Sequence, residues 1–243
     1  MDGISIIVLT KDRPDLFLQC ARSIPARPFV VERIVVQHGT DEETVRIAEA
    51  SGWRVVGDGR NRSYSAGNNL AASGAAGSHL LLLNNDARLD EGCLDALWRR
   101  RAHPLVGCLI LDRHGRVNHA GIAYNHKSFL PVHIGNRQDR STVTGDRYAP
   151  SATFAAAMIE KRLWDALGGL SEDYWYSFED VDFCLRAHER GVRVLVAHDA
   201  VVYHDESSTR QPAAVDPGNL KVWRARWIRT RRLADALGLT EDD

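Results

Sequence analysis

The chain has 243 residues, with 31 Lys and Arg against 32 Asp and Glu and a formal net charge of −1. A chain of this length can bury roughly three quarters of the surface that its unfolded form exposes, which excludes a disordered protein or a small stapled scaffold. The near-neutral charge argues against a protein held to nucleic acid by bulk positive charge, because that binding scales with the phosphates neutralised by Lys and Arg.

The cysteines and the hydrophobic runs favour a cytoplasmic protein. The four cysteines are widely spaced and form no C-x-x-C pair, so the sequence indicates neither a disulfide framework nor a zinc site. The N-terminus has a short apolar run and no basic region, and no other stretch approaches the 18 or so apolar residues of a membrane span. We therefore expect neither a signal peptide nor a transmembrane segment.

The first part of the chain alternates short β-branched runs with helical patterns, which is typical of a parallel sheet with crossover helices. A helix is expected to start near Pro14 with Asp12 as its cap, and Thr40 with Glu43 resembles a capping box for a second helix that runs to Ser51. The predicted strands cover residues 4–9, 33–37, 53–56 and 79–83, and a third helix covers 65–73.

After about residue 90 the regular alternation of strands and helices ends. We expect a helix over 92–103, strands over 106–111 and 117–124 paired antiparallel through the turn 112–115, and a long polar loop over 125–150. An apolar stretch (154–159), helices (161–167 and 179–190) separated by a Gly-Gly break, strands (192–197 and 201–204) and a basic helical tail (217–238) complete the prediction. The fold class is α/β, a single domain with a mostly parallel, Rossmann-like central sheet flanked by helices and a small antiparallel extension.

A polar triplet, Asn84-Asn85-Asp86, follows directly after the fourth strand. In an open α/β sheet, ligands bind beyond the carboxyl ends of the strands, where an acidic residue can reach a metal without lying in the core. Asp86 is therefore a candidate metal ligand. The triplet also fits an ordinary Asn/Asp turn that caps the next helix.

Acidic residues open the predicted helix at 179. Glu179, Asp180 and Asp182 suit the positive end of a helix dipole, and this is their structural explanation. The aromatic residues before them would wall a carboxylate, as a sugar site and its general base require. These residues are Tyr174, Trp175, Tyr176 and Phe178.

His204 ends the last predicted strand. A single histidine there is either a metal ligand or a hydrogen-bond partner, and the other nine histidines show no comparable placement. Together with Asp86, it suits Mn²⁺ or Mg²⁺ carrying a diphosphate, whose oxygens and water would fill the remaining positions.

These segments, in this order, resemble a family 2 glycosyltransferase with the GT-A fold, from residue 4 to about 210. Each motif is weak alone, but the ordered set is specific. The motifs are ISIIVLTKDRPDLFLQCARSI, VERIVVQHGTDEET, NRSYSAGNNLA, LLLLNNDARLD, LWDALGGLSEDYWYSFEDVDFCLRAHERGVRV and VVYHDES.

The resemblance implies a nucleotide-binding role for several residues. The end of the first strand would lie against the base, and Gln37 stands where the family usually has the Asp of a V-V-D-N-G-S-type motif, with His38 after it. The stretch 61–69 is similar to the family's N-x-G-x-x-x-x-N, with Ser63 where Gly is usual. The nucleotide-binding residues implied are Thr10, Lys11, Asp12, Arg13, Gln37, Asn61, Asn68, Asn84 and Asn85.

The resemblance also assigns the chemistry. Asn84-Asn85-Asp86 stands at the family's D-x-D motif with only the last acid kept, so Asp86 and His204 would hold the metal and Glu179-Asp180 would match the E-D motif, whose Asp is the base. The implied reaction inverts the anomeric centre: an acceptor hydroxyl, deprotonated by Asp180, displaces the nucleoside diphosphate. An Asp of ordinary pKa is already ionised at pH 7. Trp175 and Tyr176 would pack on the acceptor, although Trp175 also fits core packing.

The C-terminal segment 221–232 has six basic residues and no acidic one. A basic amphipathic helix with tryptophans can lie on an anionic membrane and present a lipid-linked acceptor. The preferred interpretation is that its apolar face packs on the catalytic domain or on a second subunit.

The predicted organisation is a GT-A domain over 1–210, with a nucleotide-sugar half (about 1–100) and an acceptor half (about 101–210), and a tail over 211–243. The expected enzyme is a metal-dependent hexosyltransferase that uses a UDP or dTDP sugar and a hydroxyl-bearing acceptor, cytoplasmic and in peripheral membrane contact or dimeric through the tail. The alternatives are an inactive nucleotide-sugar-binding protein and a sugar-phosphate nucleotidyltransferase. The latter normally has a Gly-rich loop after its first strand, and this chain has none there.

Overall fold

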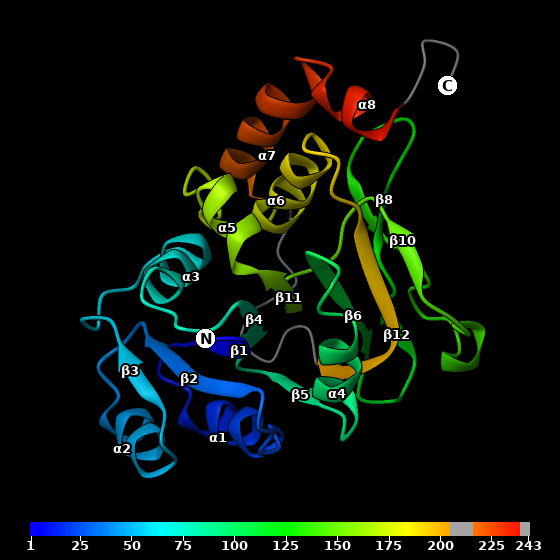
Figure 1. Cartoon of the computed structure of the whole chain (residues 1–243). Helices are drawn as coiled ribbons and strands as arrows, with labels where there is room; N and C mark the ends of the chain where they lie inside the picture. Colours follow the sequence, from blue (N-terminus) through cyan, green and yellow to red (C-terminus); the bar gives the residue numbers. More distant parts are fainter. Residues whose placement is uncertain (205–215, 239–243) are drawn as a thin grey trace.

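The computed structural model describes residues 1–204 and 216–238, and within these a ten-stranded mixed sheet runs through the molecule (Figure 1). The strand order is β10-β12-β6-β11-β4-β1-β2-β3, with β5 paired to β12 and β7 to β6. A separate two-stranded sheet joins β8 and β9. The expected α/β class with a small antiparallel extension is confirmed.

The predicted alternation of strands and helices in the first part is confirmed. Strands β3, β2, β1 and β4 lie side by side and parallel. Their bounds, with those of the crossover helices, are β1 (Ile4–Thr10), α1 (Pro14–Arg22), β2 (Val30–Gln37), α2 (Glu42–Ala50), β3 (Arg54–Val56), α3 (Tyr64–Ser73) and β4 (His79–Asn84).

Two predicted helix caps are wrong. Arg13 occupies the N-cap of α1 and makes no side-chain cap bond, and Asp12 before it has a positive φ of 49°. At α2 the cap is Asp41, whose carboxylate accepts hydrogen bonds from the backbone N–H groups of Glu43 and Thr44. At α2 both Thr40 and Asp41 are capping residue types and the backbone places Asp41 at the cap, whereas at α1 the positive φ of Asp12 belongs to a turn that leaves its side chain out of the capping position.

The second part adds strands of mixed direction. The strand β11 is antiparallel to both β4 and β6, whereas β12 runs parallel to β6. The bounds are β5 (Ala87–Leu89), α4 (Cys93–Arg99), β6 (Leu105–Leu111), β7 (Val117–His119), β8 (Ile122–Tyr124), β9 (Pro131–His133), a 3-10 turn (Arg140–Thr142), β10 (Arg147–Ala149), β11 (Ala156–Glu160), α5 (Lys161–Leu167), α6 (Glu179–His188) and β12 (Val194–His204).

Three predictions for this part need correction. The strand expected over 117–124 is broken at Gly121, where φ is +108°, so that β7 pairs with β6 but β8 joins the small sheet. The region 125–150 is not a featureless loop, because it contains β9, the 3-10 turn and β10. The two last predicted strands are one strand, β12, with an irregular register between Ala197 and Val201.

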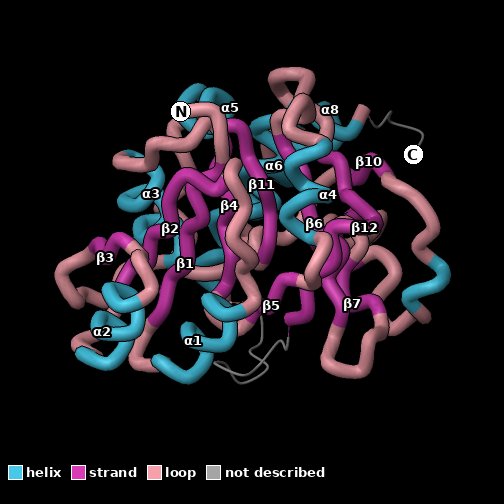
Figure 2. Tube along the Cα trace, turned by 60° about the horizontal axis from the view of Figure 1, so that its bottom comes forward, coloured by secondary structure: helices cyan, strands magenta, loops and turns pink. Residues whose placement is uncertain are grey.

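Helices cover both faces of the sheet, as Figure 2 shows. Alternate residues of β1 point to opposite faces: Ile6 joins a core with residues of α1, α2 and α4, and Ile7 joins a second core with residues of α3, α5 and α6. Because β1 is buried on both faces, residues 6–9 are all apolar instead of alternating with polar residues.

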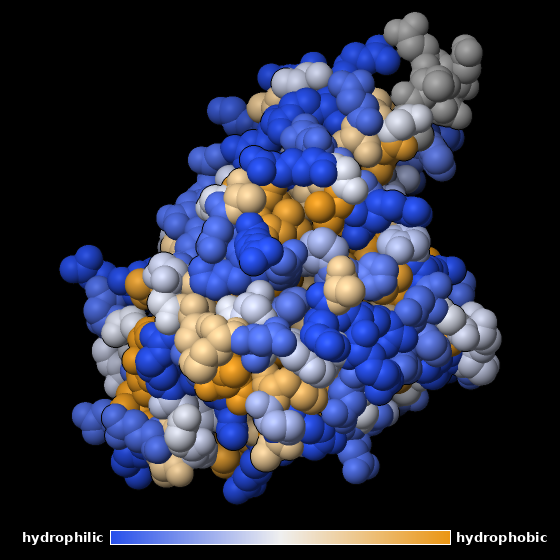
Figure 3. Space-filling view, viewed as in Figure 1, coloured by the Kyte–Doolittle hydropathy of each residue, from blue (hydrophilic) through white to orange (hydrophobic). Residues whose placement is uncertain are grey.

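The C-terminal segment is not one helix. It forms α7 (Pro217–Trp223), a π-helical turn (Arg224–Ile228) and α8 (Arg232–Leu237), with a break at Arg231, whose φ is +60°. Trp223 and Trp227 are fully buried in a third core with α6 and the β8 strand. The tail therefore packs on the domain, in agreement with the preferred interpretation of the sequence. These elements lie over α6 in Figure 1, and the outward face there is mostly hydrophilic in Figure 3. The predicted boundary at 210/211 lies outside the described residues.

None of the helices in the described part of the chain has the length and apolar character needed to span a bilayer.

Candidate active site

The carboxyl ends of three parallel strands meet at one edge of the sheet. In the strand register Thr10 lies beside Gln37, and Leu9 lies beside Asn84. Residues that follow β1, β2 and β4 are therefore neighbours in space, although they are far apart in the sequence. This is the edge at which open α/β sheets bind ligands.

The predicted residues at the end of β1 take three different positions. The Thr10 hydroxyl accepts a hydrogen bond from the Asn85 side-chain amide at 3.1 Å, which links β1 to the turn after β4. The Asp12 carboxylate packs against Gly39, where an added Cβ would meet it at 2.0 Å. Lys11 is exposed. These contacts bring the loops after β1, β2 and β4 together.

Arg13 is paired with Asp15 through two hydrogen bonds, of 2.8 and 2.7 Å. The carboxylate of Asp15 raises the pKa of the Arg13 guanidinium, and Asp86 contributes to the same shift. Arg13 therefore lies within electrostatic range of the candidate metal ligand.

Gln37 and His38 line the end of β2. The Gln37 amide nitrogen donates to the Asp41 carbonyl at 2.7 Å, so this side chain holds the loop before α2. His38 is buried, and its Nε2 lies where a Cβ on Gly67 would meet it at 2.5 Å. Burial lowers the pKa of His38 to about 4, with smaller contributions from Arg62 and Lys11. The imidazole is therefore neutral at pH 7.

The stretch 61–69 forms the start of α3. Asn61 is exposed before the helix, and Ser63 is its N-cap, with its hydroxyl accepting from the Ala66 N–H at 3.1 Å. The φ of −61° at Ser63 suits any L-residue, so no glycine is required there. Asn68 is buried and its amide donates to the Tyr64 carbonyl at 3.0 Å, which directs this side chain into the helix.

The two predicted metal ligands are brought together. Asp86 lies in the turn between β4 and β5, and β5 pairs with the end of β12 so that Ala87 is opposite His204. Asp86 Oδ1 and His204 Nε2 are 3.0 Å apart, and both side chains are largely buried. The Asn84 amide nitrogen lies 3.4 Å from the same imidazole nitrogen. A carboxylate oxygen and an imidazole nitrogen at this spacing fit a shared divalent cation.

The predicted base opens α6 after a strained turn. Ser177 and Phe178 have φ values of 75° and 73°, a left-handed conformation that non-glycine residues adopt at a cost. Asp180 then accepts hydrogen bonds from the Val181 N–H at 2.8 Å and the Phe154 N–H at 3.4 Å. Its neighbour Glu179 is buried.

The pKa of Asp180 is raised above the ordinary value that we expected from the sequence. Burial is the main cause, and the two N–H groups, the His133 imidazole and the Thr153 hydroxyl act in the opposite direction. A raised pKa makes the ionised carboxylate a better proton acceptor near neutral pH.

Two hydrogen bonds connect Asp180 to the strand that leads to Asp86. The Asn84 N–H donates to the Ala155 carbonyl at 2.9 Å, and the adjacent Phe154 N–H donates to Asp180. The end of β4, which leads to Asp86, and the start of α6 are thus connected through two consecutive residues before β11.

The candidate acceptor residues are at the surface. Trp175 is 59% exposed and Tyr176 is 40% exposed, so the alternative of core packing for Trp175 is wrong. The buried Asn219 of α7 holds their backbone: its side-chain oxygen accepts from the Trp175 N–H at 3.1 Å, and its amide nitrogen donates to the Tyr176 carbonyl. The aromatic rings are therefore presented to solvent on a fixed backbone.

Asp182 has a structural role. Its fully buried carboxylate accepts from the Trp227 indole at 2.8 Å and from the Arg186 and Arg226 guanidinium groups at 2.8 and 3.1 Å. It ties the C-terminal elements to α6, beyond the helix-dipole role that its position in the sequence suggested.

Four residues near Asp180 and His204 were not expected. Tyr64 donates to the Phe154 carbonyl at 2.6 Å, and its pKa is raised well above the usual value by burial, with Glu179 and Asp180 adding to the shift. Thr153, His119 and His133 are the others, and the two histidines contradict the expectation that His204 alone has a meaningful placement. Local sequence signals could not find them, because long-range pairings position them.

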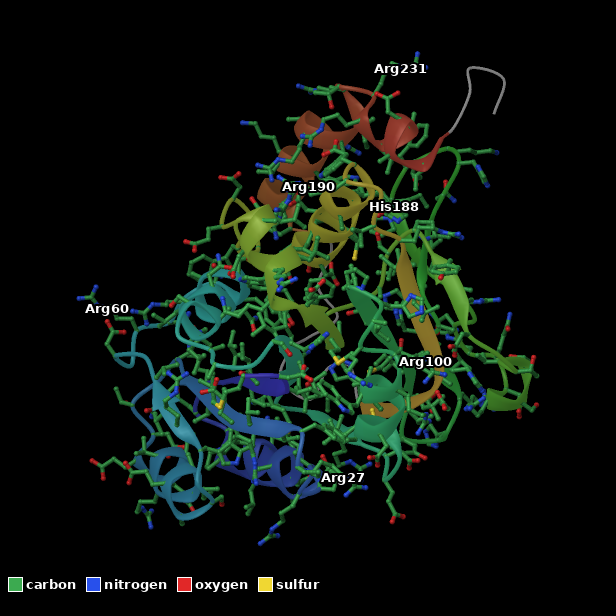
Figure 4. All side chains as sticks on the ribbon, in the orientation of Figure 1. Arg27, Arg60, Arg100, His188, Arg190 and Arg231 are labelled. Atoms are coloured by element: carbon green, nitrogen blue, oxygen red, sulfur yellow. The ribbon has the colours of Figure 1, made fainter. Side chains whose placement is uncertain are left out.

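A second group of possible cation ligands lies elsewhere and is occupied by ion pairs. Asp146, His198 and Asp199 have ligand atoms within 4.8 Å of one another. Arg100, which follows α4 and is labelled in Figure 4, contacts Asp146 at 2.6 Å and Asp199 at 2.8 Å, and Arg99 also pairs with Asp199. Because two guanidinium groups already balance the two carboxylates, this cluster is less suited to a cation than Asp86 and His204.

Sequence comparisons identify the family. A family model described as glycosyl transferase family group 2 matches residues 79–238. The chain is 32% identical over 231 residues to the O-antigen biosynthesis protein RfbC of Myxococcus xanthus, covering 87% of this chain and 18% of that protein. It is 22% identical over 208 residues to the low-salt glycan biosynthesis hexosyltransferase Agl10 of Haloferax volcanii, covering 80% of this chain and 64% of that protein.

Solved structures show the same fold. A crystal structure of GalNAc-T7 with UDP, GalNAc and Mn²⁺ has a TM-score of 0.72 at 13% identity, covering 95% of this chain and 49% of that one. Residues 1–349 of S. aureus TarS give a TM-score of 0.59 at 19% identity, covering 84% of this chain and 60% of that one. The chain belongs to the family 2 glycosyltransferases and has the GT-A fold, and it spans less than two thirds of each of these relatives.

Proposed function

We propose that this chain transfers a hexosyl group, with inversion, from a UDP or dTDP sugar to a hydroxyl of a glycan acceptor, with Asp180 as the base. The family assignment supports the transfer class, and the printed names of RfbC and Agl10 support an acceptor in O-antigen or glycan synthesis. The observation that carries the proposal is the half-buried Asp180, held by two backbone N–H groups and connected through Phe154 and Ala155 to the strand that leads to Asp86.

The residues at the carboxyl edge would bind the donor. The ends of β1 and β2 would receive the nucleoside, and the Asn85–Thr10 hydrogen bond fixes a turn that would lie beneath the diphosphate. Asp86 and His204 would hold Mn²⁺ or Mg²⁺, whose charge offsets that of the departing diphosphate. The neutral amides Asn84 and Asn85 add no further negative charge to this region.

The acceptor side would perform the proton transfer. Trp175 and Tyr176 offer aromatic faces for a sugar ring, and Asp180 accepts the proton of the attacking hydroxyl as the new glycosidic bond forms. The raised pKa of Asp180 favours this acceptance, and the Val181 and Phe154 N–H groups orient the carboxylate. Holding donor and acceptor together supplies much of the remaining acceleration.

The test compares Asp180→Asn with Asp165→Asn, which alters an exposed carboxylate of α5 paired with Lys161. Transfer is measured with UDP and dTDP sugars plus Mn²⁺ and saccharide acceptors, and donor binding by thermal shift. We expect Asp180→Asn to reduce turnover by about 10²–10⁴-fold with donor binding retained, and Asp165→Asn to leave both unchanged. Turnover of Asp180→Asn within about tenfold of the unaltered protein would remove Asp180 as the base. Donor binding without transfer or donor hydrolysis in the unaltered protein would favour the inactive binding protein.

A further inference from the structure

The segment 117–133 contacts residues 151–155, which include the Phe154 N–H that donates to the candidate base Asp180. Ile122 of β8 exchanges two backbone hydrogen bonds with Ser151, of 2.7 and 3.2 Å, and the Tyr124 hydroxyl lies 2.7 Å from the Ser151 hydroxyl. Ile122 is also opposite His133 of β9 in the small sheet. These pairings bring two histidines, His119 and His133, to the same region as residues 151–155.

His119 is buried and accepts a backbone hydrogen bond. The Thr153 N–H donates to its Nε2 at 3.3 Å, and the next N–H along the chain, that of Phe154, donates to Asp180. Because Nε2 accepts, the ring proton of the neutral imidazole lies on Nδ1. Burial lowers the pKa of His119 well below its usual value, and His133 and His204 contribute, so the ring remains a neutral acceptor.

His133 packs against the His119 ring. The two imidazole rings are 5.1 Å apart in an edge-to-face arrangement, and the His133 Nδ1 lies 3.4 Å from the Asn118 side-chain oxygen. His133 also favours the ionised form of the Asp180 carboxylate. The titratable groups that interact electrostatically with Asp180 or His119 are Tyr64 of α3, Tyr124 of β8, His204 of β12 and, on the same helix as Asp180, Cys184.

We infer that His119 and His133 are positioning residues for the transfer reaction. His119 fixes the Thr153–Phe154 peptide, whose Phe154 N–H orients the Asp180 carboxylate, and His133, which the β8–β9 pairing places beside the His119 ring, acts on that carboxylate through its imidazole. This inference rests on the proposed role of Asp180 as the base.

Truncation of His119 has a specific consequence. In His119→Ala the half-buried Thr153 N–H loses its acceptor, and the adjacent Phe154 N–H is no longer held against Asp180. Small displacements of the Asp180 carboxylate from its reacting position slow the reaction, so we expect kcat to fall by about ten- to a hundredfold with little change in the donor KM. In His119→Gln the side-chain oxygen can accept from Thr153, and we expect most of the lost kcat to return.

Replacing His133 tests its action on the carboxylate. In His133→Gln the imidazole that favours ionised Asp180 is removed, so the pKa of Asp180 should rise further. We expect the acidic limb of the kcat–pH profile to move to higher pH. A purely structural role for His133 would change the amplitude of the profile but not the position of this limb.

The experiment uses the full chain with saturating donor and Mn²⁺, and measures kcat, donor KM, the pH profile and the thermal midpoint of each variant. His114→Ala is the matched control, because His114 is exposed on the turn before β7. If His119→Ala fails to fold, His119→Gln and His133→Gln still decide the matter through kcat and the acidic limb.

The outcomes separate this inference from the proposed function. If Asp180→Asn is inactive but His119→Ala keeps kcat within about twofold of the control, or the acidic limb of His133→Gln does not move, the inference is overturned and the base remains. If Asp180→Asn itself remains active, the proposed function fails first.

Discussion

The buried carboxylate of Asp182 offers the sharpest test of how the C-terminal segment is held. We consider Asp182→Asn, which keeps the shape of the side chain and removes its charge. Asp182 is fully buried, whereas its partners Arg186 and Arg226 are 17% and 26% exposed at the side chain. The substitution therefore leaves two guanidinium groups near the core without their shared counter-charge.

The expected loss follows from this geometry. Removing one partner of a buried ion pair costs about 3–5 kcal/mol, and the partial exposure of both arginines places this case near about 3 kcal/mol. For a chain of this size, that corresponds to a fall of roughly 6–12 °C in the thermal midpoint. The Trp227 indole and the Tyr174 hydroxyl can still donate to the remaining amide oxygen, so their hydrogen bonds contribute little to the loss.

Urea unfolding monitored by tryptophan fluorescence measures this loss, because Trp223 and Trp227 lie in the affected core. The matched control is Asp173→Asn, since Asp173 also pairs with Arg226 but is 61% exposed. We expect the control to change the free energy of unfolding by no more than about 0.5 kcal/mol. Equal losses in the two variants, or a loss below about 1 kcal/mol for Asp182→Asn, would refute the role assigned to the buried carboxylate.

Three further outcomes are expected. Excess chelator should abolish transfer and His204→Ala should raise the Kd for Mn²⁺ in a titration; full activity in chelator would contradict the metal pair. Trp175→Ala should raise the acceptor KM while donor binding and the thermal midpoint stay unchanged, and an altered donor affinity would argue against an acceptor role. Because burial lowers the pKa of His38 to about 4, the unfolded chain binds its proton more readily, so this residue's contribution to stability is present near neutral pH and is lost as pH falls from about 6.5 to 4. His38→Gln should flatten the pH dependence of the unfolding midpoint in that window, and an unchanged slope would show that other groups cause it.

The parts of the fold that sequence patterns predict are those governed by local periodicity. The alternation of β-branched runs and helices predicts β1 to β4, and the rule that parallel strands share a carboxyl edge then brings Thr10, Gln37 and Asn84 together. The family resemblance predicts that Asp86 and His204 act together, and the antiparallel pairing of β5 with β12 brings their side chains to 3.0 Å from each other.

The features of the fold and site that the sequence does not predict depend on long-range strand pairing or on backbone conformation. His119 is placed by the pairing of β7 with β6, and His133 by the pairing of β9 with β8, which in turn bridges to Ser151; nothing in the sequence near either histidine indicates these long-range contacts. Asp12 resembles a cap, but a positive φ directs its side chain to Gly39. Asp182 looks like one more acid at a helix start, and only the return of the C-terminal segment shows its arginine and indole partners.

The hydrogen bonds between Asn219 and the backbone of Trp175 and Tyr176 mean that the acceptor side and the donor side of the site can change independently in evolution. The surface that would meet the acceptor is supported from the C-terminal helices, whereas the edge that would receive the donor is built by β1, β2 and β4. Substitutions in α7 can therefore alter the aromatic loop and leave the donor edge intact. A lineage could change the sugar acceptor in this way while keeping its activated donor, and chimaeras that exchange only residues 216–238 would reveal this modularity directly.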